Sequence, residues 1–206
     1  MAPELVLRWA EESDVVYAAD SGGDRLIDQG LMPNKIVGDL DSAKSIDRLE
    51  KLAANRALDL VRDMSVDQTD CDKLLDLAYK EGHDEITLVS VEGDQLDHVL
   101  AVLQSAARSP LRVRIALRSG IGWVLSSSDE IDIPTRPGRR VSVVPLTPTE
   151  GVSLRGVHWP LERSTMNPLG LTSISNVAVE ETVHAHVQEG AVFLFVEYSP
   201  DEVPFW

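Results

Sequence analysis

The sequence predicts an α/β fold in two parts, an N-terminal open, mostly parallel α/β sheet domain followed by a small C-terminal β-sandwich domain. Through residue 128, short apolar runs alternate with helical patterns, which is typical of a parallel sheet covered by helices. From residue 129 the helical periodicity stops, and short alternating runs are separated by Gly, Pro and charged turns. The polar, proline-containing stretch 126–138 is interpreted as the boundary. We therefore expect domains at 1–128 and 129–206.

The strands of the first domain are short apolar runs, and each helix repeats apolar residues every three or four positions. The strands are expected at 14–20, 33–41, 57–61, 85–91, 111–117 and 122–127. The helices are expected at 4–13, 23–30, 43–56, 70–82 and 97–108. Ser42 is a candidate N-cap of the third helix, and Thr69 with Asp72 has the spacing of a capping box at the fourth.

In the second domain, apolar and polar residues alternate, as in strands with one buried face. These strands are expected at 139–146, 151–157, 172–181, 182–187 and 191–198. Their short length and the turns between them favour a small β-sandwich.

The chain of 206 residues carries a net charge of −15, from 19 basic and 34 acidic residues. This charge argues against a nucleic-acid or anionic-membrane surface, and a phosphate site in such a protein needs metal ions to offset its field. The single cysteine, Cys71, cannot form an internal disulfide, which favours a reducing compartment. No apolar stretch is long enough to cross a bilayer, and residues 1–14 do not resemble a signal peptide. We expect a cytoplasmic protein.

Two aspartates stand two positions apart at the end of the predicted strand 33–41. Asp39 and Asp41 point the same way along an extended chain, so both carboxylates can face one spot. Like charges held this close repel each other unless a cation lies between them. The pair therefore predicts a cation site.

Carboxylates also follow the neighbouring strands. Asp20 ends the first strand and leads into a Ser-Gly-Gly turn, whose backbone N–H groups could meet an anion. Asp67 and Asp70 follow the third strand, and Asp97 and His98 follow the fourth. A single Asp at such a turn is more often an N-cap. Because ligands of open α/β sheets sit outside the carboxyl ends of strands, four such ends together predict a site for a hard cation such as Mg²⁺ with phosphate.

Other motifs carry less weight. No P-loop and no G-x-G-x-x-G segment is present in the sequence. His184 and His186 could chelate a metal from one strand face, but a solvated strand is the commoner explanation. Cys71 is interpreted as a helix residue without a nucleophilic role.

Six short segments of the sequence occur in an order that is typical of one protein family. They are ADSGGDRL at 19–26, GDLDS at 38–42, DQTDCDKLL at 67–75, GDQLDH at 93–98, GVHWPL at 156–161 and TSISN at 172–176. In this order they resemble the motifs of the thiamine pyrophosphokinase family, the first four more closely than the last two. The resemblance covers most of the chain.

The resemblance implies transfer of the diphosphoryl group of ATP to the hydroxyl of thiamine, with AMP as the second product. It implies Mg²⁺ bound by Asp39, Asp41 and Asp70. The proton acceptor would be Asp97 or one carboxylate of the Asp39/Asp41 pair. The residues implied in catalysis are Asp39, Asp41, Asp70 and Asp97. Those implied in ATP binding are Asp20, Gly22, Gly23, Arg25, Asp67, Gln68, Thr69 and His98.

The family binds thiamine between the subunits of a homodimer. The residues implied here are Trp159, Ser173, Ser175 and Asn176. A flat aromatic ring such as that of Trp159 suits a cationic heterocycle, although a core tryptophan of the sandwich explains it equally well. Because Trp159 follows His158 in an alternating run, only one of the two can face the interior.

The sequence departs from the family at three places. Ser21 stands where the family usually has Gly, and Asp94-Gln95 replace the usual Gly-Arg, which removes a cation near phosphate. The family's opening strand is not expected, since the first helix pattern begins at residue 4. Two alternatives stay open: a related pyrophosphokinase acting on another alcohol such as a hydroxymethylpterin, and a thiamine-binding sensor that has lost turnover.

Overall fold

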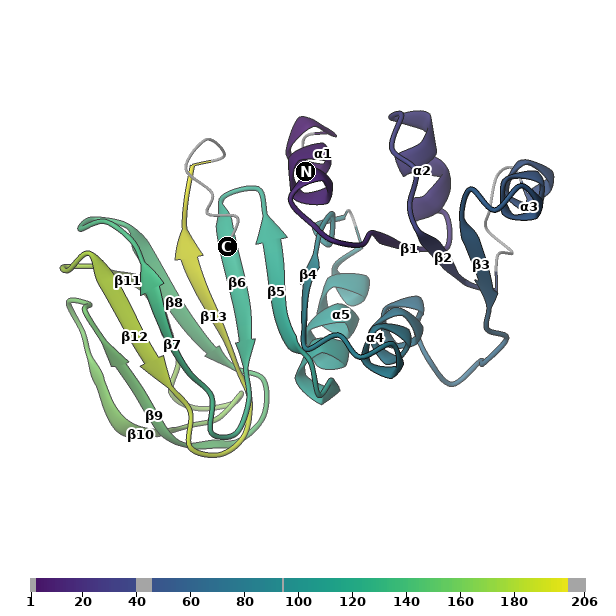
Figure 1. Ribbon diagram of the computed structural model, residues 1–206. Helices are drawn as coiled ribbons and strands as arrows, with labels where there is room; N and C mark the ends of the chain where they lie inside the picture. Colours follow the sequence, from purple (N-terminus) through teal and green to yellow (C-terminus); the bar gives the residue numbers. More distant parts are fainter. Residues whose placement is uncertain (1–2, 40–45, 94, 200–206) are drawn as a thin grey trace. The chain divides into compact units, whose positions relative to one another are not determined.

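The computed structural model describes residues 3–39, 46–93 and 95–199 (Figure 1). The chain divides into two compact units between His83 and Asp84. None of the described helices is both long and apolar enough to cross a membrane.

The first unit contains a parallel sheet with the strand order β1-β2-β3. Its elements are α1 (Pro3–Glu11), β1 (Tyr17–Ala19), α2 (Gly22–Asp28), β2 (Lys35–Gly38), α3 (Ile46–Ala54), β3 (Asp59–Arg62) and α4 (Asp70–Lys80). Tyr17 pairs with Lys35, and Lys35 pairs with Asp59, so the three strands begin level with one another. Their carboxyl ends therefore lie at one edge, as the sequence predicts for the strands that carry Asp20 and Asp39.

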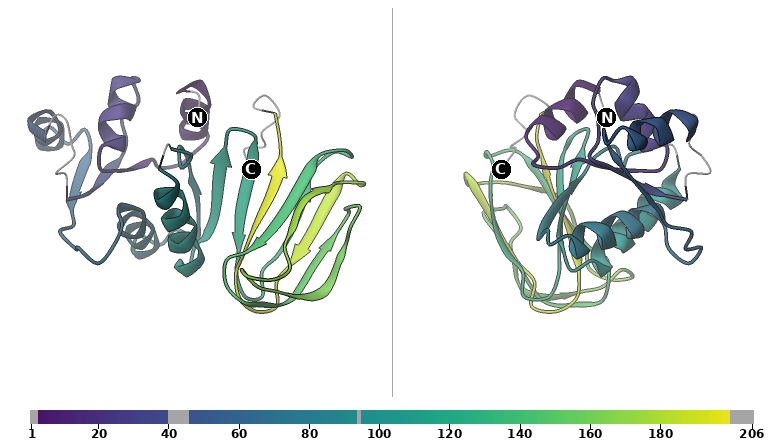
Figure 2. Two further views of the ribbon diagram at one scale, coloured as in Figure 1. Left: turned by 180° about the vertical axis from the view of Figure 1, so that it is seen from behind. Right: turned by 45° about the vertical axis from the view of Figure 1, so that its right-hand side comes forward.

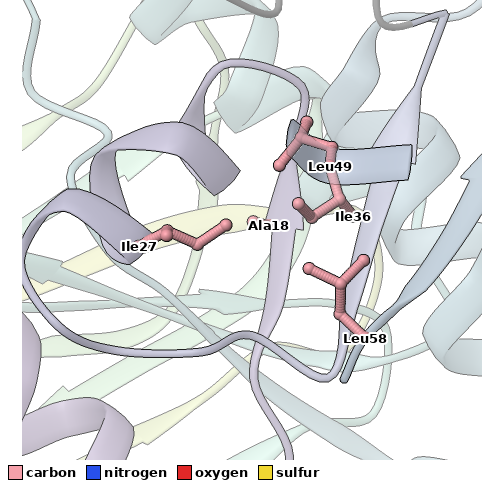
Figure 3. Close-up of a cluster of buried hydrophobic side chains, with 5 residues drawn as sticks. All are labelled: Ala18, Ile27, Ile36, Leu49 and Leu58. Carbon is pink, nitrogen blue, oxygen red and sulfur yellow. The ribbon is translucent and has the colours of Figure 1, made fainter. Parts of the chain in front are cut away.

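A small apolar core holds α2 and α3 against this sheet (Figure 3). Ile36 on β2 and Leu49 on α3 are completely buried, and full burial of such a side chain stabilises the fold by roughly 1.5–3 kcal/mol. Gly23 lets α2 approach closely, because a Cβ atom at this position would lie 2.4 Å from Ile36 Cδ1. The core thus fixes where the turn after β1 lies.

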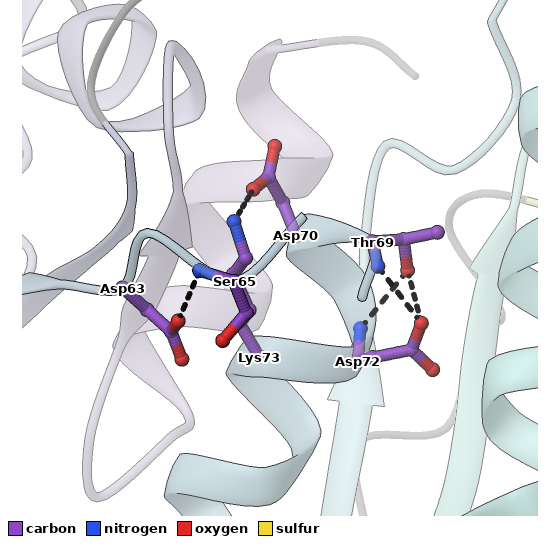
Figure 4. Close-up of polar contacts among 6 residues, drawn as sticks. All are labelled: Asp63, Ser65, Thr69, Asp70, Asp72 and Lys73. Carbon is purple, nitrogen blue, oxygen red and sulfur yellow. Dashed lines mark hydrogen bonds and ion pairs between the residues drawn. The ribbon is translucent and has the colours of Figure 1, made fainter. Parts of the chain in front are cut away.

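The start of α4 confirms the predicted capping box (Figure 4). Thr69 Oγ1 accepts a hydrogen bond from the backbone N–H of Asp72 at 3.1 Å, and the N–H of Thr69 donates to Asp72 Oδ2 at 3.0 Å. Both N–H groups would otherwise lack helical partners, so the pair defines where the helix begins.

A polar cluster ties the other end of α4 to the amino edge of the sheet. Glu81, at the C-cap of α4, accepts a hydrogen bond from the Tyr17 hydroxyl and lies 2.7 Å from Lys35 Nζ. The Tyr17 hydroxyl is also 3.0 Å from His83 Nε2. Lys35 reaches Asp59 at 3.4 Å as well. The cluster joins the first residues of three strands to one helix.

The second unit contains one helix and ten strands among its described residues. They are β4 (Glu85–Leu88), α5 (Leu96–Arg108), β5 (Arg112–Leu117), β6 (Gly120–Leu125), β7 (Glu130–Pro134), β8 (Arg140–Pro145), β9 (Thr149–Arg155), β10 (Leu161–Met166), β11 (Ser173–Val177), β12 (Thr182–His186) and β13 (Val192–Glu197). One sheet has the order β11-β8-β13-β6-β5-β4, and the other has the order β10-β9-β12-β7.

The two sheets of this unit bury alternate residues of their strands. Figures 1 and 2 show the four-stranded sheet facing the β8 and β13 part of the six-stranded sheet. Leu194 on β13 and Leu154 on β9 are completely buried, and so is Val183 on β12. The Tyr198 hydroxyl donates to the carbonyl of Pro134 and so links the end of β13 to β7. The alternating runs of the sequence therefore do form strands with one buried face.

The mixed α/β fold is confirmed, but the prediction of one open, mostly parallel sheet in the first 128 residues is wrong. Strands β4, β5 and β6 belong to the six-stranded sheet, in which β4 and β5 are parallel and all other neighbours are antiparallel. The physical reason is the two-residue turn at 118–119, which can join only antiparallel strands. The domain boundary at 128/129 stays a prediction.

Two of the strands are not predicted by the sequence pattern. Strand β7 lies inside the stretch 126–138, where Pro134 is tolerated because β7 is an edge strand. Strand β10 pairs with β9 through two register shifts, and Arg163 within it has φ of +46°. These irregularities break the period of two that identifies a strand.

The amino-edge cluster predicts a loss of stability at alkaline pH. The pKa of Tyr17 is raised to about 12, first by burial and then by its hydrogen bond to Glu81. Because this value lies above the ordinary 10.0, the protonated phenol stabilises the fold fully below about pH 10, and this contribution is lost as the pH rises toward about 12. Tyr17→Phe should therefore flatten the pH dependence of the free energy of unfolding, measured by urea denaturation.

A second test variant and a control variant accompany that measurement. Burial also raises the pKa of Tyr198 to about 12, so Tyr198→Phe should flatten the profile too. Tyr79→Phe removes an exposed phenol and serves as the control. A Tyr17→Phe profile as steep as that of the parent would contradict the assignment.

Candidate active site

The carboxyl edge of the three-stranded sheet brings Asp20 and Asp39 to the ends of neighbouring strands. The N–H of Asp20 donates to the carbonyl of Val37 at 2.8 Å, directly before Gly38 and Asp39. Gly38 has φ of +151°, and a Cβ atom there would lie 3.3 Å from Asp20 Cβ. Only glycine accepts this backbone at so close an approach. The sequence motif GD at 38–39 therefore has a geometric cause.

Asp20 itself is held in an uncommon conformation. Its side chain is buried, and its φ of +43° lies in the left-handed region, which Asp tolerates better than most residues. Such strained, buried polar residues concentrate at functional sites. This observation supports the interpretation of Asp20 as part of a binding site rather than as a simple N-cap, and α2 has no side-chain cap bond from the preceding Ser21.

The turn after Asp20 is less open to an anion than expected. The N–H of Gly23 already donates to the carbonyl of Asp20 at 3.0 Å. A Cβ atom on Gly22, in contrast, would point into open space, with no neighbouring side chain within 4 Å, and the Arg25 side chain is exposed. Of this turn, the backbone at Gly22 and the Arg25 side chain stay candidates for phosphate contact.

Asp70 and Lys73 form an ion pair in the first turn of α4 (Figure 4). Lys73 Nζ lies 3.4 Å from Asp70 Oδ1, and the other oxygen of Asp70 points away from Lys73. The Lys73 side chain is only 4% exposed, whereas that of Asp70 is 41% exposed. A buried ammonium needs such a partner, and in return it fixes the carboxylate in one orientation. Asp70 is thus half-open to a ligand.

Lys73 is a candidate that the sequence motifs did not single out. Its positive charge lies among carboxylates. Hydrogen bonds from Ser65 hold the pKa of Asp63 below its usual range, and the charge of Lys73 lowers it further. The signal was available in the sequence, because Asp70 and Lys73 have the i, i+3 spacing of facing residues on a helix.

Other residues expected at this site are engaged in local structure. The Thr69 hydroxyl donates to Asp72 Oδ2 at 2.7 Å within the capping box. Gln68 Nε2 donates to Asp76 Oδ2 at 2.7 Å, while Asp67 is exposed. These contacts give Gln68 and Thr69 a role at the start of α4, and their roles in ATP binding stay predictions.

The remaining carboxylates fall elsewhere. Asp97 and His98 are exposed in the first turn of α5, which belongs to the second unit. Asp41 and Asp94 lie outside the described residues. Within the described part of the chain, no group of three His, Cys, Asp or Glu side chains is close enough to hold a metal ion. The Mg²⁺ site therefore stays a prediction that needs Asp41.

In the second unit, Trp159 lies on a loop and not in the sandwich core. Its side chain is 60% exposed, and its ring stands at 84° to that of His158 with the centroids 4.5 Å apart. His158 is exposed as well. The interpretation as a core tryptophan is therefore wrong. Neither of the two side chains faces the interior, because the extended run ends at Arg155.

Ser173, Ser175 and Asn176 lie on the edge strand β11. A register shift between Ser173 and Asn176 forms a bulge, in which Ser175 has φ of +56° and its N–H donates to Ser142 Oγ at 3.1 Å. Asn176 bonds to the backbone of Trp159 through both ends of its amide. The structure thus brings Trp159, Ser173 and Asn176 together, as the motif order implies.

The fold and these groups define a mixed α/β protein with acidic strand ends and a β-sheet unit that presents an exposed tryptophan. Two family models match it in order. "Thiamin pyrophosphokinase, catalytic domain" matches residues 6–117, and "Thiamin pyrophosphokinase, vitamin B1 binding domain" matches residues 128–192. The chain belongs to the thiamin pyrophosphokinase family.

Relatives agree with this assignment. The thiamine pyrophosphokinase of Bacillus subtilis (strain 168) is 26% identical over 190 residues, which cover 90% of this chain and 86% of that protein. Two solved structures show the same fold. That of thiamine pyrophosphokinase from Bacillus subtilis has a TM-score of 0.72 at 24% identity, covering 88% of this chain and 86% of that one. That of thiamin pyrophosphokinase from Candida albicans has a TM-score of 0.76 at 15% identity, covering 97% and 86%.

Proposed function

We propose that the protein transfers the diphosphoryl group of ATP to the hydroxyl of thiamine, giving thiamine diphosphate and AMP. The match of a catalytic model and a vitamin B1 binding model in one chain carries the proposal. The thiamine oxygen forms a bond to the β-phosphorus, and the bond between that phosphorus and the oxygen bridging to the α-phosphate breaks. The hydroxyl proton passes to Asp97 or to a carboxylate of the Asp39/Asp41 pair.

Carboxylates of the first unit suit a Mg²⁺ ion. Asp39, Asp41 and Asp70 offer oxygen ligands, and Lys73 holds one oxygen of Asp70 while the other points away. When bound, Mg²⁺ neutralises charge on the phosphates and orients them for in-line attack. The chain itself is strongly acidic, at −15, so phosphate binding without a cation would be opposed by its field.

ATP would bind at the edge that carries Asp20, with Gly22, Gly23 and Arg25 in the adjoining turn. The proposed contacts from other elements are Asp67, Gln68, Thr69 and His98. Thiamine would bind at Trp159, Ser173 and Ser175, whose groups are presented by the second unit. We further propose a cytoplasmic location, and an α/β domain at 1–128 with a β-sandwich domain at 129–206.

The alternatives are not favoured. The vitamin B1 binding model covers the segment that contains Trp159 and the bulge of β11, which speaks for thiamine and against a pterin alcohol. The sequence contains the whole acidic set Asp39, Asp41 and Asp70, and clustered negative charge without a catalytic use would be a liability, which speaks against a sensor without turnover. Thiamine is therefore the acceptor that we propose.

The metal assignment predicts that Asp39→Asn abolishes transfer without harming the fold. The change removes one negative charge from the proposed cation site, so AMP formation from ATP, Mg²⁺ and thiamine should fall by about 100-fold or more. In metal-free buffer the variant should melt no lower than the parent, since a repulsive charge is lost. Asp47→Asn, at an exposed position on α3, is the matched control. Parent-like turnover of Asp39→Asn would refute the assignment.

The exposed indole predicts a role in acceptor binding only. Contact of a cation with a tryptophan ring is worth about 1–2 kcal/mol, so Trp159→Ala should raise the thiamine KM by about tenfold and leave the ATP KM nearly unchanged. Because the side chain is 60% exposed, the melting temperature should hardly change. Trp159→Phe should lie between the two. An unaltered thiamine KM in Trp159→Ala would remove this residue from the site.

A homodimer is proposed from the family resemblance and from exposed apolar side chains around the thiamine residues. Those of the segment 159–179 are Trp159, Leu169, Leu171, Ile174 and Val179. Exposed apolar side chains mark a contact with another protein chain when they lie in one patch. Light scattering should give twice the chain mass at micromolar concentration, and Ile174→Asp should shift it toward the monomer. A fully active monomeric parent would contradict this proposal.

A further inference from the structure

Asn176 is the most completely bonded polar side chain near the proposed thiamine site. It is only 1% exposed. Its Oδ1 accepts from the N–H of Trp159 at 3.1 Å and from its neighbour Val177 N–H at 2.9 Å. Its Nδ2 donates to the carbonyl of Trp159 at 2.7 Å and to Ser173 Oγ at 3.3 Å.

These four bonds use the whole capacity of the side chain. An Asn amide offers two N–H donors and two acceptor lone pairs, and each of them has a partner here. A thiamine molecule that bonded to Asn176 would first have to break one of these buried contacts. Direct recognition of the ligand by this amide is therefore disfavoured by the geometry.

We propose that Asn176 is a positioning residue that fixes the backbone of Trp159 and so sets where the indole meets the acceptor. This inference rests on the proposed function and revises the role that the family resemblance implies for Asn176. Asn176 acts on Trp159 as a neighbouring strand would, because a single amide pairs with both the N–H and the carbonyl of one residue. Trp159 is then fixed by its backbone while its ring stays open to a ligand.

The loop that carries Trp159 needs such a clamp. Gly156 has φ of +77°, and a Cβ atom there would lie 2.1 Å from the carbonyl oxygen of Thr182, so the chain leaves β9 in a sharp turn. His158 N–H still reaches the carbonyl of Val177 at 2.8 Å. At Trp159 the backbone bonds are made to the Asn176 side chain. The clamp thus extends the pairing between the loop and β11 by one residue, from His158 to Trp159.

The same clamp also engages the hydroxyl of Ser173. Its oxygen accepts from Asn176 Nδ2, so its own hydrogen is directed to another partner. The Ser173 hydroxyl keeps its hydrogen for another partner, and a ring nitrogen of a pyrimidine would suit it as an acceptor. Thiamine carries such nitrogens in its pyrimidine ring.

Hydrogen exchange of the ligand-free protein tests the clamp directly. The amide hydrogen of Trp159 is bonded to Asn176 Oδ1, so in Asn176→Ala it should exchange at least about tenfold faster than in the parent. Asn167→Ala is the matched control, since the Asn167 side chain accepts from the backbone N–H of Leu169 in its own loop. If Asn176→Ala proves too unstable, Asn176→Ser serves in its place. Unchanged exchange at Trp159 in a folded variant would overturn the proposal.

A double-mutant cycle separates positioning from direct contact. If Asn176 acts through Trp159, Asn176→Ala should raise the thiamine KM by about tenfold, leave the ATP KM within about twofold, and add nothing in a Trp159→Ala background. Additive effects on the thiamine KM would show that Asn176 contacts the ligand by itself and would overturn the inference. Failure of the proposed function would appear differently: thiamine would not be turned over by the parent, while the exchange result at Trp159 would still hold.

Discussion

The level parallel register of β1, β2 and β3 is the constraint on which the proposed chemistry depends. Since the strands begin level at Tyr17, Lys35 and Asp59, their amino edge gathers opposite charges that tie down the end of α4. The same register brings Asp20 and Asp39 out together at the carboxyl edge. A slip of one residue would separate the strand ends and reverse the faces of their side chains. The ion pairs at the amino edge thus help to hold the register that places Asp20 and Asp39 at the carboxyl edge.

The acidic character of the chain is handled locally. A protein with a charge of −15 that is proposed to bind a polyphosphate has to limit repulsion within its own site. Lys73 does this inside the protein, where a 4% exposed ammonium offsets Asp70 without presenting a competing cation at the surface. The second unit is proposed to bind its ligand differently, through an exposed ring and through hydroxyl groups on the edge strand β11.

The sequence predicted what depends on neighbouring residues. The start of α4 followed from Thr69 and Asp72, because a capping box is local in the sequence. The division of the strands before residue 128 between two different sheets was not predictable in this way, since β6 pairs with β13 across a long stretch of chain. The clamp of Asn176 on Trp159 was missed for the same reason. A motif identifies the residues of a site, but only folding shows which of them touch the ligand and which support those that do.

The strand order of the six-stranded sheet has a consequence for how the chain folds during its synthesis. Strand β13 lies between β6 and β8, so residues 192–197 are needed before these two halves of the sheet can join. The three-stranded sheet, in contrast, has all its strands by residue 62. During translation the edges of β6 and β8 therefore stay unpaired until β13 has been made. Pairings between such distant segments also form slowly. In that interval these unpaired edges are open to wrong partners and to chaperones.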